Sequence, residues 1–289
     1  MKLLETLRLR LEFVVVWLMI VLARAMPLRM ASWLSGKLWR LIAPRLSRQK
    51  RALANLELAF PEKSPGERKA LAAAMWENLG RTFAESLCLP ALIKSDRIVF
   101  EPAESFDAAA SGAKPFIVCG LHLGNWEILA YGGQRLGISL IGVYQRLSNP
   151  YVDDLTRSLR EPLYKAGLTP KTPVAARVLL RAIKDGASPC FLADLRDDNG
   201  PFVPFFGQPA RSTVFPALLA RRTGVPLYAG AAFRRPGGRF SIRIMPIPMP
   251  HTNNSAADAL AATKTLQRQF EAFIREAPEQ WMWAHRKWG

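Results

Sequence analysis

In the segment KPFIVCGLHLGNWEIL, residues 114–129, the spacing of apolar residues changes half-way along. Its first half is an apolar run that is typical of a buried strand, and its second half begins a helical pattern. His122 follows the end of that strand, which lies near Gly120. Because open α/β sheets bind ligands at the carboxyl ends of their strands, the segment predicts a strand-to-helix unit with a reactive side chain at its turn.

The same alternation continues through the rest of the chain. Four further apolar runs are typical of strands, at residues 140–144, 188–194, 225–233 and 240–247. Helical patterns are found at 125–135, 150–166, 174–185, 212–223 and 257–276. A capping box at residues 64–67 begins an earlier helix. The order of these elements predicts an α/β fold with a mixed, largely parallel sheet flanked by helices.

The chain is strongly basic. It has 289 residues and a formal net charge of +17, with 49% hydrophobic residues. Such a charge indicates an anionic partner, which is a nucleic acid, a membrane surface or a phosphorylated substrate. Zinc-ligand spacings and aromatic RNA-binding motifs are missing from the sequence, and arginine alternates with apolar residues near the amino terminus. We therefore predict anionic membrane lipids, and no nucleic acid, as partners.

Three widely spaced cysteines, Cys88, Cys119 and Cys190, form no Cys-His metal pattern. We interpret all three as reduced thiols in a domain that faces the cytoplasm. The sequence predicts neither a metal nor a cofactor.

The amino-terminal region has three interpretations. Residues 13–23 form an uncharged apolar run of eleven residues, whereas a bilayer span needs about 20. The run is compatible with a signal peptide, with an amphipathic or partly inserted helix, and with the core helix of a soluble domain. Tryptophans beside arginines in residues 26–51 favour the membrane interface. We expect residues 1–60 to form a membrane anchor with a basic interfacial segment, and residues 61–289 to form the catalytic domain.

His122 and Glu127 lie five residues apart across the predicted turn. A carboxylate that holds one imidazole nitrogen leaves the other to accept a proton, which makes a general base. A structural histidine is the alternative. The sequence contains no Gly-x-Ser-x-Gly elbow, so the attacking alcohol is expected to come from the substrate. We interpret His285, near the carboxyl terminus, as structural or interfacial.

Six motifs point to one family. They are KRALANLELAFP (50–61), MWENLGRTFAE (75–85), GLHLGNWEIL (120–129), GVYQRLSNP (142–150), GPFVPFFG (200–207) and PEQWMWAHRKW (278–288). The third resembles the H-x₄-D/E block of glycerolipid-type acyltransferases. Together they resemble the late, or secondary, acyltransferases of lipid A biosynthesis, the lauroyl/myristoyl transferase family.

This resemblance implies a glycerol-phosphate-acyltransferase-like fold with an amino-terminal membrane-anchoring helix. It implies His122 as the general base and Glu127 as its partner. Arg160 corresponds to an arginine suited to a phosphate or an oxyanion. Asp194 corresponds to an aspartate that would anchor Arg160 or the acceptor sugar. We also assign Gly124 and Asn125 to substrate binding, since small residues allow a ligand close to the backbone.

The resemblance further implies transfer of a fatty acyl chain from acyl carrier protein to a hydroxyl of a lipid A precursor, without a metal. The expected location is the bacterial inner membrane, with the catalytic domain on the cytoplasmic side. Three alternatives stay open: an acyltransferase for a lysophospholipid or glycolipid acceptor, a thioesterase, and a non-enzymatic membrane or nucleic-acid binder.

Overall fold

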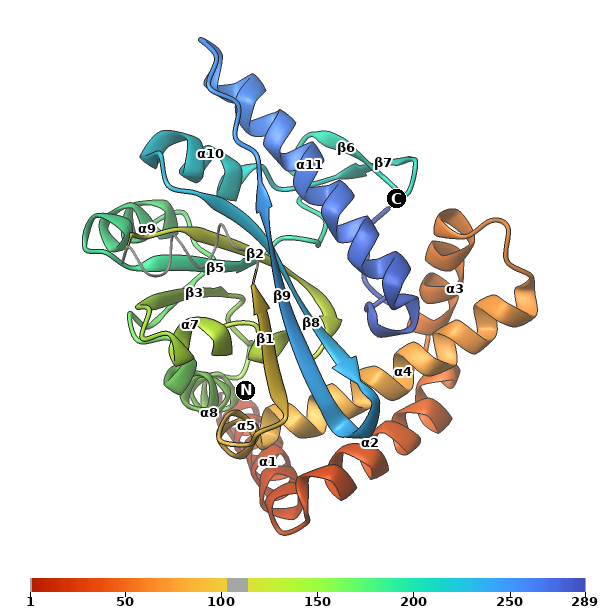
Figure 1. Ribbon diagram of the computed structural model, residues 1–289. Coiled ribbons are helices and arrows are strands. Elements are labelled where there is room, and N and C mark those ends of the chain that lie inside the picture. The colour runs from red at the N-terminus through yellow and green to blue at the C-terminus, as the bar shows by residue number, and fades with distance from the viewer. Residues whose placement is uncertain (1, 103–113, 289) are drawn as a thin grey trace.

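A seven-stranded sheet forms the centre of the computed structural model, which describes residues 2–102 and 114–288 (Figure 1). The strand order is β1-β9-β8-β2-β5-β3-β4. Only β8 and β9 pair antiparallel in this sheet. The strands are β1 (Ile98–Pro102), β2 (Ile117–Gly124), β3 (Leu140–Tyr144), β4 (Leu168–Pro170), β5 (Ser188–Leu192), β8 (Leu227–Arg235) and β9 (Arg239–Ile247). A separate hairpin joins β6 (Phe202–Phe205) to β7 (Gln208–Arg211).

Helices cover both faces of the sheet. The longer helices are α1 (Lys2–Arg24), α2 (Leu28–Ile42), α3 (Arg48–Ala59), α4 (Pro65–Leu87), α8 (Pro150–Arg160), α9 (Ala175–Lys184), α10 (Phe215–Thr223) and α11 (Ser255–Glu276). Two short helices are α5 (Leu89–Ile93) and α7 (Tyr131–Arg135). Short 3₁₀ turns are η1 (Ala43–Arg45), η2 (Trp126–Ile128), η3 (Glu161–Leu163), η4 (Pro236–Gly238) and η5 (Pro278–Gln280).

Side chains of β2 alternate between two apolar cores. Ile117, Cys119 and Leu121 pack into the core that α3, α4, α9, α10 and α11 share. Phe116 and Val118 pack into the opposite core, against α5 and α7. Because successive side chains of a strand point to opposite faces, an uninterrupted apolar run is what a strand buried on both faces requires. The fold is therefore a three-layer α/β/α arrangement.

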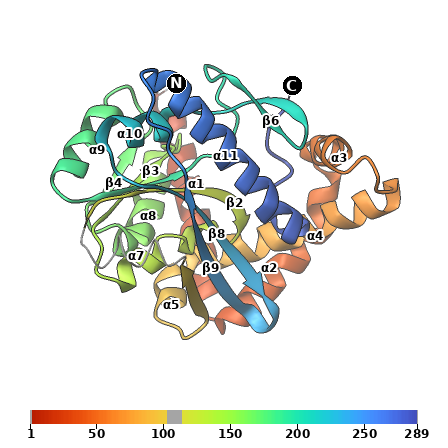
Figure 2. The same cartoon turned by 45° about the horizontal axis from the view of Figure 1, so that its top comes forward.

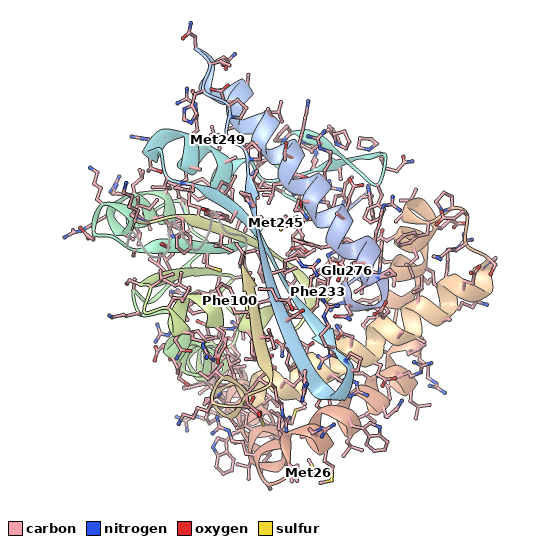
Figure 3. The ribbon with its side chains drawn as sticks, viewed as in Figure 1. Met26, Phe100, Phe233, Met245, Met249 and Glu276 are labelled. Atoms are coloured by element: carbon pink, nitrogen blue, oxygen red, sulfur yellow. The ribbon has the colours of Figure 1, made fainter. Side chains whose placement is uncertain are left out.

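Helix α11 crosses one face of the sheet at β8 and β9. Phe233 of β8 and Glu276 of α11 are labelled in Figure 3 near this crossing. Arg243 of β9 forms an ion pair of 2.6 Å with Glu276, and its guanidinium lies 5.0 Å from the centre of the Phe233 ring. Polar and apolar contacts together hold the helix on the antiparallel pair.

The first three helices pack against the rest of the molecule, as Figures 1 and 2 show for α2 along α4. Gly80 of α4 allows close approach of α2, because a Cβ added there would lie 2.6 Å from the carbonyl oxygen of Ser35. Ala52 and Leu56 of α3 are fully buried in the larger core. Ile20 and Ala23 of α1 pack with residues at the end of α4.

The structure confirms the predicted α/β class and the largely parallel sheet. It does not support the amino-terminal membrane-anchoring helix that we expected. In residues 2–102 and 114–288, no helix has both the length and the apolar content that crossing a bilayer requires. The predicted helix at 125–135 is divided into η2 and α7, and the pattern missed β1, β4 and the β6–β7 hairpin. These strands are short or lie at an edge of the sheet, so they contain few consecutive apolar residues and give little sequence signal.

Candidate active site

His122 and Asp194 meet at the carboxyl ends of two neighbouring strands. Strands β2 and β5 pair in parallel, so the residues that end or follow them lie side by side. The Nδ1 atom of His122 lies 2.9 Å from Oδ1 of Asp194. The backbone N–H of His122 donates to Oδ2 at 2.9 Å, and the indole N–H of Trp281 donates to the same oxygen at 2.8 Å.

Asp194 is held as a buried carboxylate. Burial alone would raise the pKa of its carboxyl, but the charge of His122 and the hydrogen bonds from it lower that pKa well below its usual value. An ionised carboxylate only accepts hydrogen bonds, so Nδ1 of His122 carries the proton. In the described part of the chain, no protein group is hydrogen-bonded to Nε2, and this nitrogen is left to act as a base.

Glu127 pairs with Arg160 through two parallel hydrogen bonds of 2.7 Å. The indole N–H of Trp126 donates to the same carboxylate at 3.1 Å. Burial would raise the pKa of Glu127, but Arg160 more than offsets this effect and lowers it. Glu127 in turn raises the pKa of Arg160. The pair is a permanently charged unit in which Glu127 fixes the guanidinium plane.

The two carboxylates thus have other partners than the sequence led us to expect. We expected Glu127 to hold the imidazole of His122 and Asp194 to anchor Arg160 or a sugar. In the structure Asp194 holds His122, and Glu127 holds Arg160. The reason is the strand order, which places β5 beside β2, while η2 directs Glu127 towards α8.

Two cavities meet at His122. The larger, of about 520 Å³, extends between β3, β5 and the starts of α9 and α10, and is lined mostly by apolar groups. The smaller, of about 230 Å³, contains Glu127 and Arg160 and reaches Tyr164 and Cys190. His122 and Phe191 line both. An apolar chain in one cavity and a polar group beside Arg160 would therefore both reach the imidazole.

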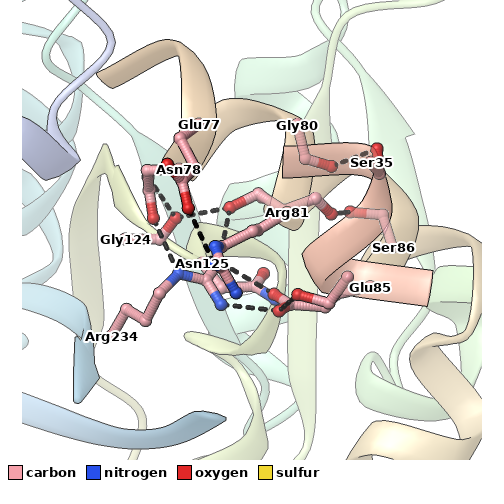
Figure 4. A network of polar contacts seen from close by, with 12 residues as sticks. Ser35, Glu77, Asn78, Gly80, Arg81, Glu85, Ser86, Gly124, Asn125 and Arg234 are labelled. Carbon is pink, nitrogen blue, oxygen red and sulfur yellow. Dashed lines mark hydrogen bonds and ion pairs between the residues drawn. The ribbon is translucent and has the colours of Figure 1, made fainter. Parts of the chain in front are cut away.

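Gly124 and Asn125, which we assigned to substrate binding, make internal contacts instead (Figure 4). Gly124 has a φ of +60°, and a Cβ there would lie 1.9 Å from the carbonyl oxygen of Ala232. Its own carbonyl accepts hydrogen bonds from Asn78 and Thr82. Asn125 is fully buried and donates to Glu85. Neither residue lines the two cavities.

A buried polar network, which sequence reasoning missed, supports the turn after β2. Arg234 of β8 forms an ion pair with Glu85, with N–O distances of 2.5 and 2.9 Å, and also donates to Asn78 and Thr82 (Figure 4). Asn78, Thr82 and Glu85 are spaced i, i+4 and i+7, so they lie on one side of α4. The spacing of these polar residues along one side of the helix was the available signal.

The cysteines lie in the core as free thiols. Burial raises the pKa of Cys190 to about 12 and raises that of Cys119 well above its usual value. Both thiols are therefore protonated at neutral pH, and neither is a ready nucleophile.

Comparison with known proteins agrees with this geometry. Residues 2–289 match the family described as bacterial lipid A biosynthesis acyltransferase. The chain belongs to this family. It is 30% identical to a lipid A biosynthesis lauroyltransferase of Escherichia coli (strain K12), over 94% of this chain and 88% of the relative. It is 25% identical to the lipid A biosynthesis palmitoleoyltransferase of the same strain, over 94% of this chain and 88% of the relative. It is 24% identical to the myristoyltransferase of that strain, over 82% of this chain and 74% of the relative.

The protein is thus an acyltransferase, and the family supports lipid A as its acceptor. Its relatives carry names with different acyl chains, so the likeness identifies the reaction class and not the chain length.

His285 of the acyltransferase lies against His122, with ring centres 4.8 Å apart. The sequence led us to interpret it as structural or interfacial. Its Nε2 is buried, and none of the residues that the structure describes forms a hydrogen bond with it. Burial, followed by the charge of His122, lowers the pKa of His285 to about 3. His285 is therefore a neutral ring at physiological pH.

This burial predicts a pH dependence of stability. Between pH 6.5 and 3 the unfolded chain binds a proton at His285 that the folded protein does not bind, so the free energy of unfolding falls as the pH falls. The His285→Phe variant keeps a ring of similar shape but cannot bind this proton. We expect its slope of unfolding free energy against pH to be smaller than that of the wild type, by up to about 1.4 kcal/mol per pH unit. Urea unfolding at several pH values measures both slopes, and parallel curves would contradict the prediction.

Proposed function

We propose that this acyltransferase moves a fatty acyl chain from acyl carrier protein to a hydroxyl of a lipid A precursor, with His122 as the general base. The observation that carries the proposal is the orientation of His122. Asp194 binds Nδ1, while Nε2 has no partner among the described residues. The ring lies where an apolar cavity meets the Arg160 cleft.

In this reaction Nε2 of His122 removes the proton from the acceptor hydroxyl. The oxygen forms a bond to the thioester carbonyl carbon, and the carbonyl becomes a tetrahedral oxyanion. When the carbon–sulfur bond breaks, the imidazolium returns its proton to the leaving thiolate. Asp194 stabilises the imidazolium between the two steps, in the same way as the aspartate of a serine-protease triad.

Arg160 is the group best placed to stabilise negative charge in the site. Its Nε and one terminal nitrogen bind Glu127, and 31% of its side chain is exposed. The backbone N–H of Asn125 donates to the carbonyl of Ala232 and is not available to an oxyanion. We assign Arg160 to the oxyanion or to an acceptor phosphate, and a charge-assisted donor of this kind contributes about 3–4 kcal/mol.

The two cavities suggest how the substrates lie. We place the acyl chain of the donor in the larger apolar cavity, because its walls bury hydrocarbon. The acceptor then approaches from the Arg160 cleft. The net charge of +17 favours association with the acidic carrier protein and with anionic lipid.

An acyl-transfer assay tests the proposal. Lauroyl- or myristoyl-acyl carrier protein is supplied with the lipid A precursor, and acylated product is measured by mass spectrometry. Acylated lipid is the expected result. Free fatty acid without acylated lipid, whether or not acceptor is present, would instead indicate a thioesterase.

We also propose that the enzyme works on the cytoplasmic face of the bacterial inner membrane. Large apolar side chains on one side of α2 are 48–62% exposed: Met30, Trp33, Leu34, Leu38 and Leu41. Basic residues of the same helix, including Arg29 and Arg40, lie beside this apolar surface. Apolar side chains flanked by tryptophan and arginine are typical of helices that lie in the interface plane.

If the apolar side of α2 contacts the membrane, a single charge placed on it should weaken membrane binding. Leu38→Glu is expected to weaken binding to phospholipid vesicles at least about tenfold, because burying a leucine contributes about 1.5–3 kcal/mol. Leu218→Glu is the matched control, since Leu218 is an exposed leucine on α10, distant from α2 (Figure 2). Vesicle flotation measures both. Equal loss in the two variants would contradict a membrane-binding surface on α2.

A further inference from the structure

A second polar cavity lies between α2, α4 and the turn that joins β8 to β9. Its volume is about 240 Å³, which corresponds to about eight water molecules in the liquid. Three arginines line it, and we call it the arginine pocket: Arg29 of α2, Arg81 of α4 and Arg97 before β1. It shares no lining residue with the two cavities that meet at His122.

The arginine pocket carries excess positive charge. No ion pair joins Arg29 or Arg97 to a carboxylate within residues 2–102 and 114–288. Arg81 is paired with Glu77 at 2.7 Å. Glu85 also lines the pocket, but its charge is compensated by Arg234. Two guanidinium groups therefore lack a counter-charge, and phosphate is, with carboxylate, one of the anions whose geometry guanidinium matches.

The position of the pocket identifies the source of that phosphate. Trp33 lines the pocket and is 51% exposed on the apolar surface of α2. A helix that lies in the interface has its apolar side at the acyl chains and its basic side chains at the depth of the headgroups. The mouth of the arginine pocket would therefore lie at headgroup level when α2 contacts a bilayer.

We propose that the arginine pocket binds the phosphate of an anionic phospholipid in the membrane on which the enzyme works. The proposal rests on the membrane location given above. Because the pocket is separate from the cavities at His122, the bound lipid is not a reactant. It orients the enzyme, so that its reacting cavities face the membrane that supplies the acceptor.

Vesicle flotation of the full-length protein tests this assignment. Phosphatidylcholine vesicles are compared with vesicles that also contain phosphatidylglycerol. We expect the wild type to bind the anionic vesicles more tightly than the neutral ones. In the Arg29→Gln/Arg97→Gln variant this ratio of affinities should be about thirtyfold smaller, about fivefold for each arginine. Thermal unfolding checks that the variant is folded.

The control is Arg222→Gln/Lys264→Gln, which removes the same charge from exposed positions on α10 and α11. It should keep most of the preference. An equal loss in both double variants would overturn the proposal, since binding would then depend only on net charge. An unchanged preference in the Arg29→Gln/Arg97→Gln variant would overturn it as well.

Two further measurements distinguish a lipid phosphate from a soluble phosphate in the arginine pocket, and test the membrane location and the reaction independently. Inorganic phosphate is added to the anionic vesicles and compared with chloride at equal ionic strength, and we expect equal binding in both. Selective loss in phosphate would overturn the lipid assignment in favour of a soluble phosphate ligand. Wild-type binding to neutral vesicles and wild-type acyl transfer are measured independently, so a failed pocket assignment is distinguishable from a failed membrane location or reaction.

Discussion

Replacing His122 with alanine is expected to lower acyl transfer by about 10²- to 10⁴-fold. The variant removes the only group that we place within reach of the acceptor proton, while Arg160 and both cavities are kept. His251→Ala is the matched control, because His251 is exposed in a loop and lines neither cavity. Product formation is measured for both variants under saturating donor and acceptor.

The Asp194→Asn variant extends this test to the carboxylate. An amide has nearly the same shape but cannot stabilise an imidazolium, so we expect a loss of similar order. Full transfer by the His122→Ala variant would remove the imidazole from the chemistry. Full transfer by the Asp194→Asn variant alone would limit Asp194 to a structural role with Trp281.

Replacing Glu85 with glutamine is expected to lower the free energy of unfolding by about 3–5 kcal/mol. Glu85 is 3% exposed and accepts hydrogen bonds from Arg234, Ser32 and Asn125. Its neutral replacement leaves the buried charge of Arg234 without a partner. Denaturant unfolding of the two proteins measures the difference.

Glu77 provides a control on the same helix. It contacts Arg81, Lys37 and Arg40, but the last two partners are 47% exposed. Ion pairs of this kind contribute about 0–1 kcal/mol, so Glu77→Gln should change stability little. The double variant Glu85→Gln/Arg234→Gln should recover part of the loss, since no unpaired charge remains. A Glu85→Gln variant as stable as the wild type would contradict the prediction.

The sequence predicted the fold class, and it placed His122 near the carboxyl end of a strand. His122 was found because it follows an apolar run at a strand end, and that position follows from local pattern alone. The partner of His122 was not found, because Asp194 is 72 residues away and only the strand order brings them together. Periodicity indicates that strands exist but does not give their neighbours.

The same limitation applies to His285 and Arg234. His285 contacts His122, and Arg234 binds Glu85 of α4, each from a distant element and through contacts that no spacing within the chain reveals. For Gly124, the sequence indicated a need for a small residue but not what approaches it. The approaching atom is the carbonyl oxygen of Ala232 on the neighbouring strand.

Trp281 lies near the carboxyl terminus, so the contact that it makes with Asp194 forms late in synthesis. Its indole holds Asp194, while Asn55 of α3 hydrogen-bonds the backbone carbonyls of Trp283 and His285. A nascent chain that has only reached β9 already contains His122, Asp194 and Arg160, yet lacks the segment that fixes the aspartate. The hydrogen bond that holds Asp194 can therefore form only after residues 281–285 have left the ribosome.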